Sequence, residues 1–209
     1  MKTKKFLFYL LAAVIGGCVP VVSLHPLFNE KDVVFDEKLL GTWVDPNTTW
    51  EFSRIAEPKN AYKLIFSDKE GKKGLFVAHL VKLKDKLFLD ACPAPWEQQD
   101  PNKIEWAYNT LFLIPAHTFI NINSIEPQLK MLRTDDEQMR EFLKADPNAV
   151  KHTVLEDKPV LTASTNELQA FVLKYAYDSR VFAETIVLGR KKTAEPNVPA
   201  ASKPGKTSK

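Results

Sequence analysis

Apolar and polar residues alternate along much of the chain, and this period of two is typical of β-strands that bury one face. The alternation is clearest over residues 50–54, 61–66, 75–84 and 86–90. Polar turns at 68–71 and 84–85 separate these runs at hairpin distances. The pattern resumes over 114–123, 129–133 and 181–191. It therefore predicts consecutive antiparallel strands.

Two segments in the second half change to helical spacing. Thr134 with Glu137, and Ser164 with Glu167, fit capping boxes that begin a helix. The apolar residues that follow recur at three- and four-residue intervals, which indicates helices packed on a core rather than cofactor sites. The predicted fold class is α+β, mainly antiparallel β, with two packed helices in the second half.

The start of the chain has the pattern of an export signal. Three lysines within residues 1–5 precede ten uncharged residues, from Phe6 to Ile15. Ten helical residues cover only about 15 Å of a hydrocarbon core of about 30 Å, so this segment is too short to span a bilayer. Residues 1–17 are therefore predicted to be a signal peptide.

The sequence Ile15-Gly16-Gly17-Cys18 ends this segment and resembles the lipobox of bacterial lipoproteins. The resemblance implies removal of residues 1–17, attachment of a diacylglycerol to the Cys18 thiol and acylation, with palmitate-type chains, of the new amino terminus. Long acyl chains hold a protein durably on a membrane. Because Val19 is not an inner-membrane retention residue, the resemblance favours the outer membrane. The alternative is an ordinary secreted protein in which Cys18 is incidental.

Charge and composition divide the remainder of the chain. The sequence has 29 basic and 26 acidic residues, and three of the lysines lie in the signal peptide. We expect a lipidated N-terminus and tether over 18–38, a single β-rich domain over 39–191 and a disordered basic tail over 192–209. The tail could instead contact an anionic envelope surface. The domain itself is mildly acidic, so nucleic acid is not an expected partner.

Gly41-x-Trp43 opens the strand-rich region and is similar to the first signature of the lipocalin and wider calycin barrels. The resemblance implies that Trp43 lies at the barrel floor and that Arg190, at the end of the last predicted strand, packs over its indole ring. It implies a lipocalin-like barrel or a strongly curved sheet. The alternative is that Trp43 is a core aromatic residue of another α+β sheet. The order of elements also looks like that of uncharacterised bacterial lipoproteins, which supports a single domain.

No catalytic or metal-binding motif is present in the sequence, so neither an enzyme nor a cofactor is expected. The four histidines never pair at metal-ligand spacing, and Cys92 has no disulfide partner if Cys18 is lipidated. His79 and His117 lie on predicted apolar strand faces. With Tyr62, they are the candidate ligand-binding residues. A hydrolase would require two of His79, Asp90, Cys92 and His117 within hydrogen-bond reach in a cleft.

The functional hypothesis from the sequence is a lipid-anchored cell-envelope lipoprotein whose lipocalin-like domain binds a small apolar ligand. Its expected partners are the membrane, through Cys18, and that ligand. The alternative is a structural or accessory lipoprotein that acts through protein contacts and has no ligand cavity. The sequence identifies no protein partner.

Overall fold

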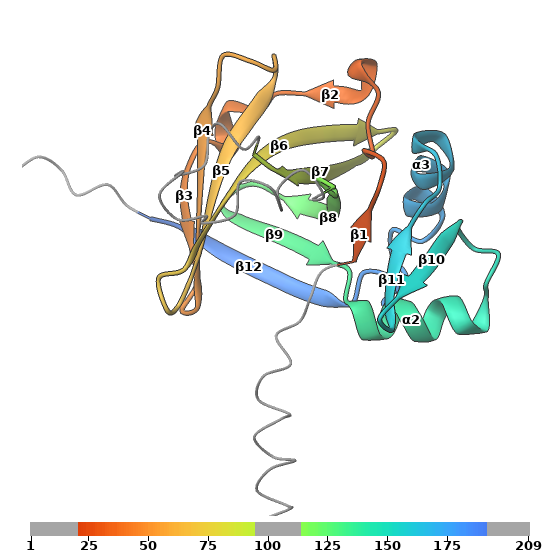
Figure 1. Ribbon diagram of the computed structural model, residues 1–209. Helices are drawn as coiled ribbons and strands as arrows, with labels where there is room; N and C mark the ends of the chain where they lie inside the picture. The colour runs from red at the N-terminus through yellow and green to blue at the C-terminus, as the bar shows by residue number, and fades with distance from the viewer. Residues whose placement is uncertain (1–20, 95–113, 192–209) are drawn as a thin grey trace, which may run out of the picture.

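The computed structural model describes residues 21–94 and 114–191. Eight antiparallel strands in these residues form a closed β-barrel (Figure 1). In chain order, they are β3 (Gly41–Val44), β4 (Thr48–Arg54), β5 (Ala61–Asp68), β6 (Lys73–Leu83), β7 (Lys86–Pro93), β8 (Thr118–Ser124), β9 (Gln128–Arg133) and β12 (Glu184–Arg190). Successive strands pair with each other, and β12 closes the ring by pairing with β3. The predicted fold class is therefore confirmed, and the barrel fits the lipocalin-like fold.

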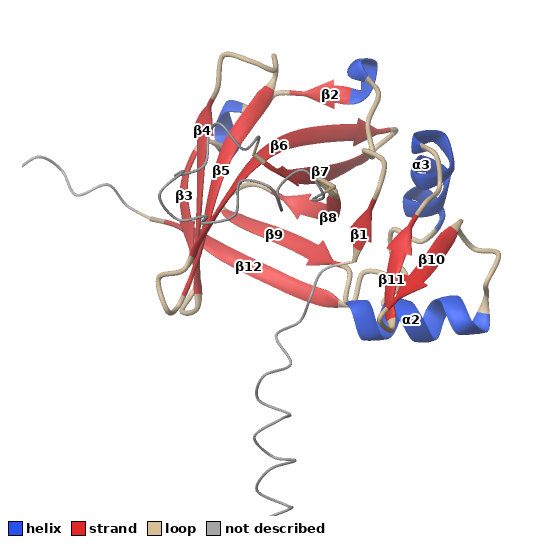
Figure 2. Cartoon of the chain, viewed as in Figure 1, coloured by secondary structure: helices blue, strands red, loops and turns tan. Residues whose placement is uncertain are grey.

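The chain leaves the barrel between β9 and β12 to build a smaller unit on one side. This unit contains α2 (Asp136–Ala145), β10 (His152–Leu155), β11 (Lys158–Leu161) and α3 (Thr165–Lys174). Figure 2 shows both helices, in blue, beside the barrel rather than inside it. The two helices expected in the second half are thus present, and they cover the outside of the barrel wall.

Residues 21–39 are packed against the domain, whereas a tether was expected over 18–38. This segment contains β1 (Val22–Ser23), η1 (Glu30–Asp32), β2 (Val33–Val34) and η2 (Glu37–Leu39). β1 pairs in parallel with β11, and β2 pairs with β6. Val21, Leu27 and Leu39 are buried. Their apolar side chains complete the cores, although their irregular spacing resembles no regular element.

Two hydrophobic cores share the barrel wall. Ala78 and Leu80 on β6 belong to the core inside the barrel. Val81 and Leu83 on the same strand belong to the core that α2 and α3 cover from outside. Both faces of this part of β6 are therefore buried, whereas the alternation predicted one buried face. The reason is tertiary, because the helices cover a face that would otherwise meet water.

The two predicted capping boxes have different outcomes. The Ser164 and Glu167 box is present at the start of α3, where the Ser164 backbone N–H donates to Glu167 at 2.9 Å. At α2, however, the N-cap is Asp135, whose carboxylate accepts the Gln138 N–H at 2.9 Å. The box expected at Thr134 and Glu137 is wrong because the adjacent aspartate is an equally good cap, while Thr134 is buried.

Cys18, the predicted signal peptide over 1–17 and the predicted basic tail over 192–209 lie outside the described residues. Across 21–94 and 114–191, none of the helices has the length and apolar character needed to cross a membrane.

Candidate functional site: a barrel with one plugged end and an apolar cavity

One end of the barrel is built around Trp43. The Arg190 guanidinium carbon lies 4.2 Å from the centroid of the Trp43 ring, as the lipocalin resemblance implies. Trp43 and Arg190 are register partners on β3 and β12. The Trp43 indole N–H donates to the Leu39 carbonyl at 2.9 Å, and Arg190 Nη1 donates to the Leu40 carbonyl at 2.7 Å. These contacts fasten η2 across the barrel floor.

Gly41 is required at this floor for two reasons. Its φ of +111° is a conformation that residues with side chains rarely adopt. A Cβ atom there would lie 2.9 Å from Arg190 Nη1. Glycine thus allows the backbone to turn into β3 and the guanidinium to reach its position over Trp43.

Tyr62 is buried in the same barrel core as Trp43. Its hydroxyl accepts the Asp36 N–H at 2.7 Å and donates to the Asp36 carbonyl at 3.1 Å. Its ring stacks on Phe35 with a centroid separation of 4.5 Å. Burial raises the pKa of the Tyr62 phenol to about 12. Tyr62 therefore holds Phe35 and Asp36 in position at this filled end of the barrel. It does not line the cavity described next.

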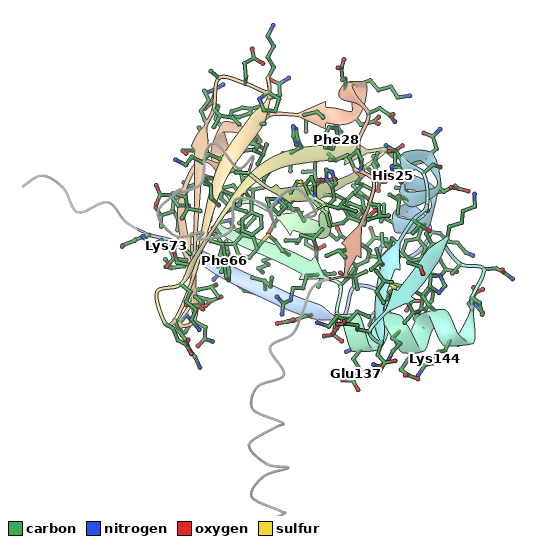
Figure 3. The ribbon with its side chains drawn as sticks, in the orientation of Figure 1. His25, Phe28, Phe66, Lys73, Glu137 and Lys144 are labelled. Atoms are coloured by element: carbon green, nitrogen blue, oxygen red, sulfur yellow. The ribbon has the colours of Figure 1, made fainter. Side chains whose placement is uncertain are left out.

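A cavity of about 320 Å³ lies inside the barrel and is bounded by six of its strands. Its lining is mostly aromatic and aliphatic and consists of Trp50, Leu64, Phe66, Phe76, Ala91, Thr118, Ile120 and Arg133. Figure 3 labels Phe66 and the nearby Lys73 at the β5–β6 hairpin on this side of the barrel. Ligand pockets are typically roughly 300 to 1,000 Å³ and mainly apolar, with a few polar groups. This cavity is at the lower limit and suits one small or narrow apolar molecule.

Arg133 is the charged residue of the cavity lining. It is the register partner of Glu184, and Arg133 Nε donates to that carboxylate at 2.5 Å. Thr118 provides the other polar side chain of the lining. Most of the remaining surface offers only van der Waals and hydrophobic contacts, so the cavity would select ligands by size and apolarity.

His79 and His117 lie at the outer wall of the barrel instead, close to Asp90. Asp90 is fully buried, and its Oδ1 lies 2.6 Å from His117 Nδ1. Its Oδ2 accepts the Leu27 N–H at 2.7 Å. His79 is the register partner of Asp90 on β6, and its ring lies 4.2 Å from the Phe28 ring. Burial lowers the pKa of His79, and the Asp90 carboxylate opposes this effect.

The Asp90 and His117 pair meets the distance that the hydrolase alternative requires. However, Asp90 is fully buried and accepts the Leu27 N–H of the N-terminal segment, and neither Asp90 nor His117 lines the barrel cavity. Burial and the Asp90 charge raise the pKa of the Cys92 thiol, whereas an activated cysteine needs a lowered pKa. The described residues contain no group of three or more His, Cys, Asp or Glu side chains arranged to hold a metal.

The sequence candidates and the cavity lining are therefore different residues. His79 and His117 both lie close to Asp90 on the outer face of the barrel. Tyr62 lies at the filled end of the barrel. Trp50, Leu64 and Phe66 could have been selected because they occupy one face of the predicted strands. No sequence pattern points to Arg133 as a lining residue. It lines the cavity because β9 lies opposite β5 and β6 in the closed ring.

Comparison of the chain with protein-family models, curated proteins and solved structures gives no match. The fold and the cavity by themselves define the class, which is an antiparallel β-barrel domain compatible with the lipocalin-like fold and flanked by a helical unit.

Proposed function

We propose that this protein is a lipid-anchored envelope lipoprotein whose barrel binds one small apolar ligand. The single observation that carries the binding role is the apolar cavity of about 320 Å³ inside the barrel. The other end of the barrel is filled by Trp43, Tyr62 and Leu39, all of them buried. A barrel filled at one end and hollow at the other is suited to hold one small ligand.

The anchoring role rests on the sequence around Cys18 and is tested separately. Full-length protein produced in a bacterium that processes lipoproteins should fractionate with membranes, and its N-terminal peptide should carry the mass of a lipidated cysteine. The Cys18→Ser variant should lose that mass and the processing that depends on the thiol. An unmodified Cys18 in the mature protein would refute the anchor.

The binding role is tested by filling the cavity. We expect the full-length protein to bind the fluorescent apolar probe N-phenyl-1-naphthylamine, and we expect Ala91→Phe to raise the Kd at least about tenfold. Ala91 is buried and lines the cavity, so a phenyl ring there occupies the space of the ligand. Val187→Phe is the matched control, because it adds a similar ring at an exposed position on β12.

Circular dichroism and thermal unfolding establish that both variants are folded before binding is compared. Equal probe affinity in the parent and in a folded Ala91→Phe variant would exclude the cavity as the binding site. Absence of probe binding, together with no co-purifying lipid beyond the anchor, would favour the accessory role through protein contacts.

A further inference from the structure

The cavity lies next to the N-terminal segment at Val21 and Ser23, where the described chain begins. Thr118 lines the cavity, and its hydroxyl donates to the Val21 carbonyl at 3.2 Å. One residue earlier, the His117 backbone exchanges two hydrogen bonds with Ser23, at 2.8 and 2.9 Å. β9 ends at Arg133, which pairs with Ile120. The N-terminal segment thus borders β8 beyond the end of β9, at the rim of the barrel.

Strand pairing, burial and hydrogen bonds fix the position of this N-terminal segment. Figure 1 shows β1 between the barrel and the unit that contains β10, β11 and α3, and β1 pairs with β11 on that side. Val21 is 4% exposed. Farther along the segment, the Pro26 carbonyl accepts a hydrogen bond from Thr165, and the Leu27 carbonyl accepts one from Gln169. The position of Val21 relative to the cavity is therefore set by contacts on both sides.

The distance from this point to Cys18 is short. Three residues extend by at most about 11 Å, because a fully extended chain spans no more than about 3.6 Å per residue. An anchor on Cys18 would hold Val21, and the barrel rim beside it, within about that distance of the bilayer surface. Ile114, three residues before His117, is 72% exposed and adds an apolar side chain close to this rim in sequence.

We propose that the barrel cavity faces the bilayer to which the protein is anchored and takes up a single-chain lipid directly from it. This inference rests on the proposed function and adds the source and class of the ligand. The cavity volume, near the lower limit for ligand pockets, suits one hydrocarbon chain rather than two. The contact between Thr118 and Val21 places the start of the described chain beside the cavity, so an anchor on Cys18 would bring the chains of the bilayer close to it.

The test separates the domain from its anchor without changing the cavity. A 20-residue Gly/Ser linker is inserted between Pro20 and Val21 of the full-length, lipidated protein, and it adds an average reach of about 25 Å. The control carries the same linker between Lys191 and Lys192. Each form is reconstituted in vesicles of phosphatidylethanolamine and phosphatidylglycerol that contain cis-parinaric acid, a fluorescent single-chain lipid. Uptake is measured as energy transfer from tryptophan to the probe. The energy transfer that remains in the Ala91→Phe form of each protein is subtracted as background.

We expect the N-terminal linker to slow uptake at least about fivefold and to leave the final occupancy unchanged, because occupancy at equilibrium depends only on the end states. The control linker should change neither quantity. Equal uptake rates in all forms, with normal occupancy, would overturn the membrane-facing arrangement and leave the binding function intact. No uptake by any form would overturn the binding function itself. Probe binding by Cys18→Ser but not by the lipidated protein would overturn the proposal, since the protein's own acyl chain would then fill the cavity.

Discussion

Asp90 should be one of the most sensitive positions for stability, although it lies on the outer wall of the barrel. Its carboxylate is fully buried and has two partners, the Leu27 N–H at 2.7 Å and His117 Nδ1 at 2.6 Å. Asp90→Ala leaves both partners without the carboxylate that they contact. A polar group left without its partner in a buried site typically costs about 1 to 3 kcal/mol, so the loss of an acceptor for both groups should cost about 2 to 6 kcal/mol.

A loss of that size is a large part of the ~5 to 15 kcal/mol by which domains are stable. With a urea m-value of ~2 kcal/mol per molar, a loss of ~4 kcal/mol lowers the unfolding midpoint by about 2 M. Asp90→Asn preserves the volume and one acceptor oxygen, so it should cost less, about 1.5 to 3 kcal/mol. The control is Glu51→Ala, an exposed carboxylate on β4, with an expected change within ~0.5 kcal/mol.

Urea unfolding followed by circular dichroism measures these differences, and hydrogen exchange gives a local measurement at the Leu27 amide. We expect Asp90→Ala to accelerate Leu27 exchange beyond the change explained by global stability, since the N–H loses its acceptor. A cost below ~1 kcal/mol for Asp90→Ala, with Leu27 protection unchanged, would refute the view that this carboxylate fastens the N-terminal segment to the barrel.

Three further outcomes test the barrel floor. Gly41→Ala should destabilise the domain by at least ~1 kcal/mol in urea unfolding, because of its positive φ and the close approach of Arg190. Arg190→Ala should cost about 1 to 2 kcal/mol and expose Trp43, observed as a red-shifted tryptophan emission with easier acrylamide quenching. Tyr62 should titrate late: its folded-state pKa of about 12 exceeds the ~10 of an unfolded tyrosine. Its contribution to stability should therefore be complete below pH ~10 and decrease as the pH rises toward 12, a decrease that Tyr62→Phe should lack.

Much of the barrel can be predicted from the sequence because strand alternation is a local property. The run over 61–66 and the turn at 68–71 correspond to β5 and its hairpin, and the stripe from Leu168 belongs to α3. The resemblance at Gly41 and Trp43 selects the end of the barrel where the indole lies. These features depend on residues within a few positions of each other, for which periodicity and turn chemistry are direct signals.

The candidate ligand residues were harder to predict, because alternation identifies two faces of a strand without stating which face is inside a closed barrel. The alternation predicts that His79 lies on an apolar strand face. The structure places that face under Phe28, where the N-terminal segment and the helical unit form a second core. Asp90 shows the same limitation, since its two partners are 63 and 27 residues away in sequence.

By itself, the sequence determined the strand and helix pattern, the mainly antiparallel fold class and the resemblances at Cys18 and Trp43. Only the tertiary structure decided which strand faces surround the cavity, which end of the barrel is filled and where the N-terminal segment lies. The physical reason is that ring closure and the docking of residues 21–38 depend on contacts between distant segments. Their energies come from burial and hydrogen bonding in the assembled fold rather than from local preference.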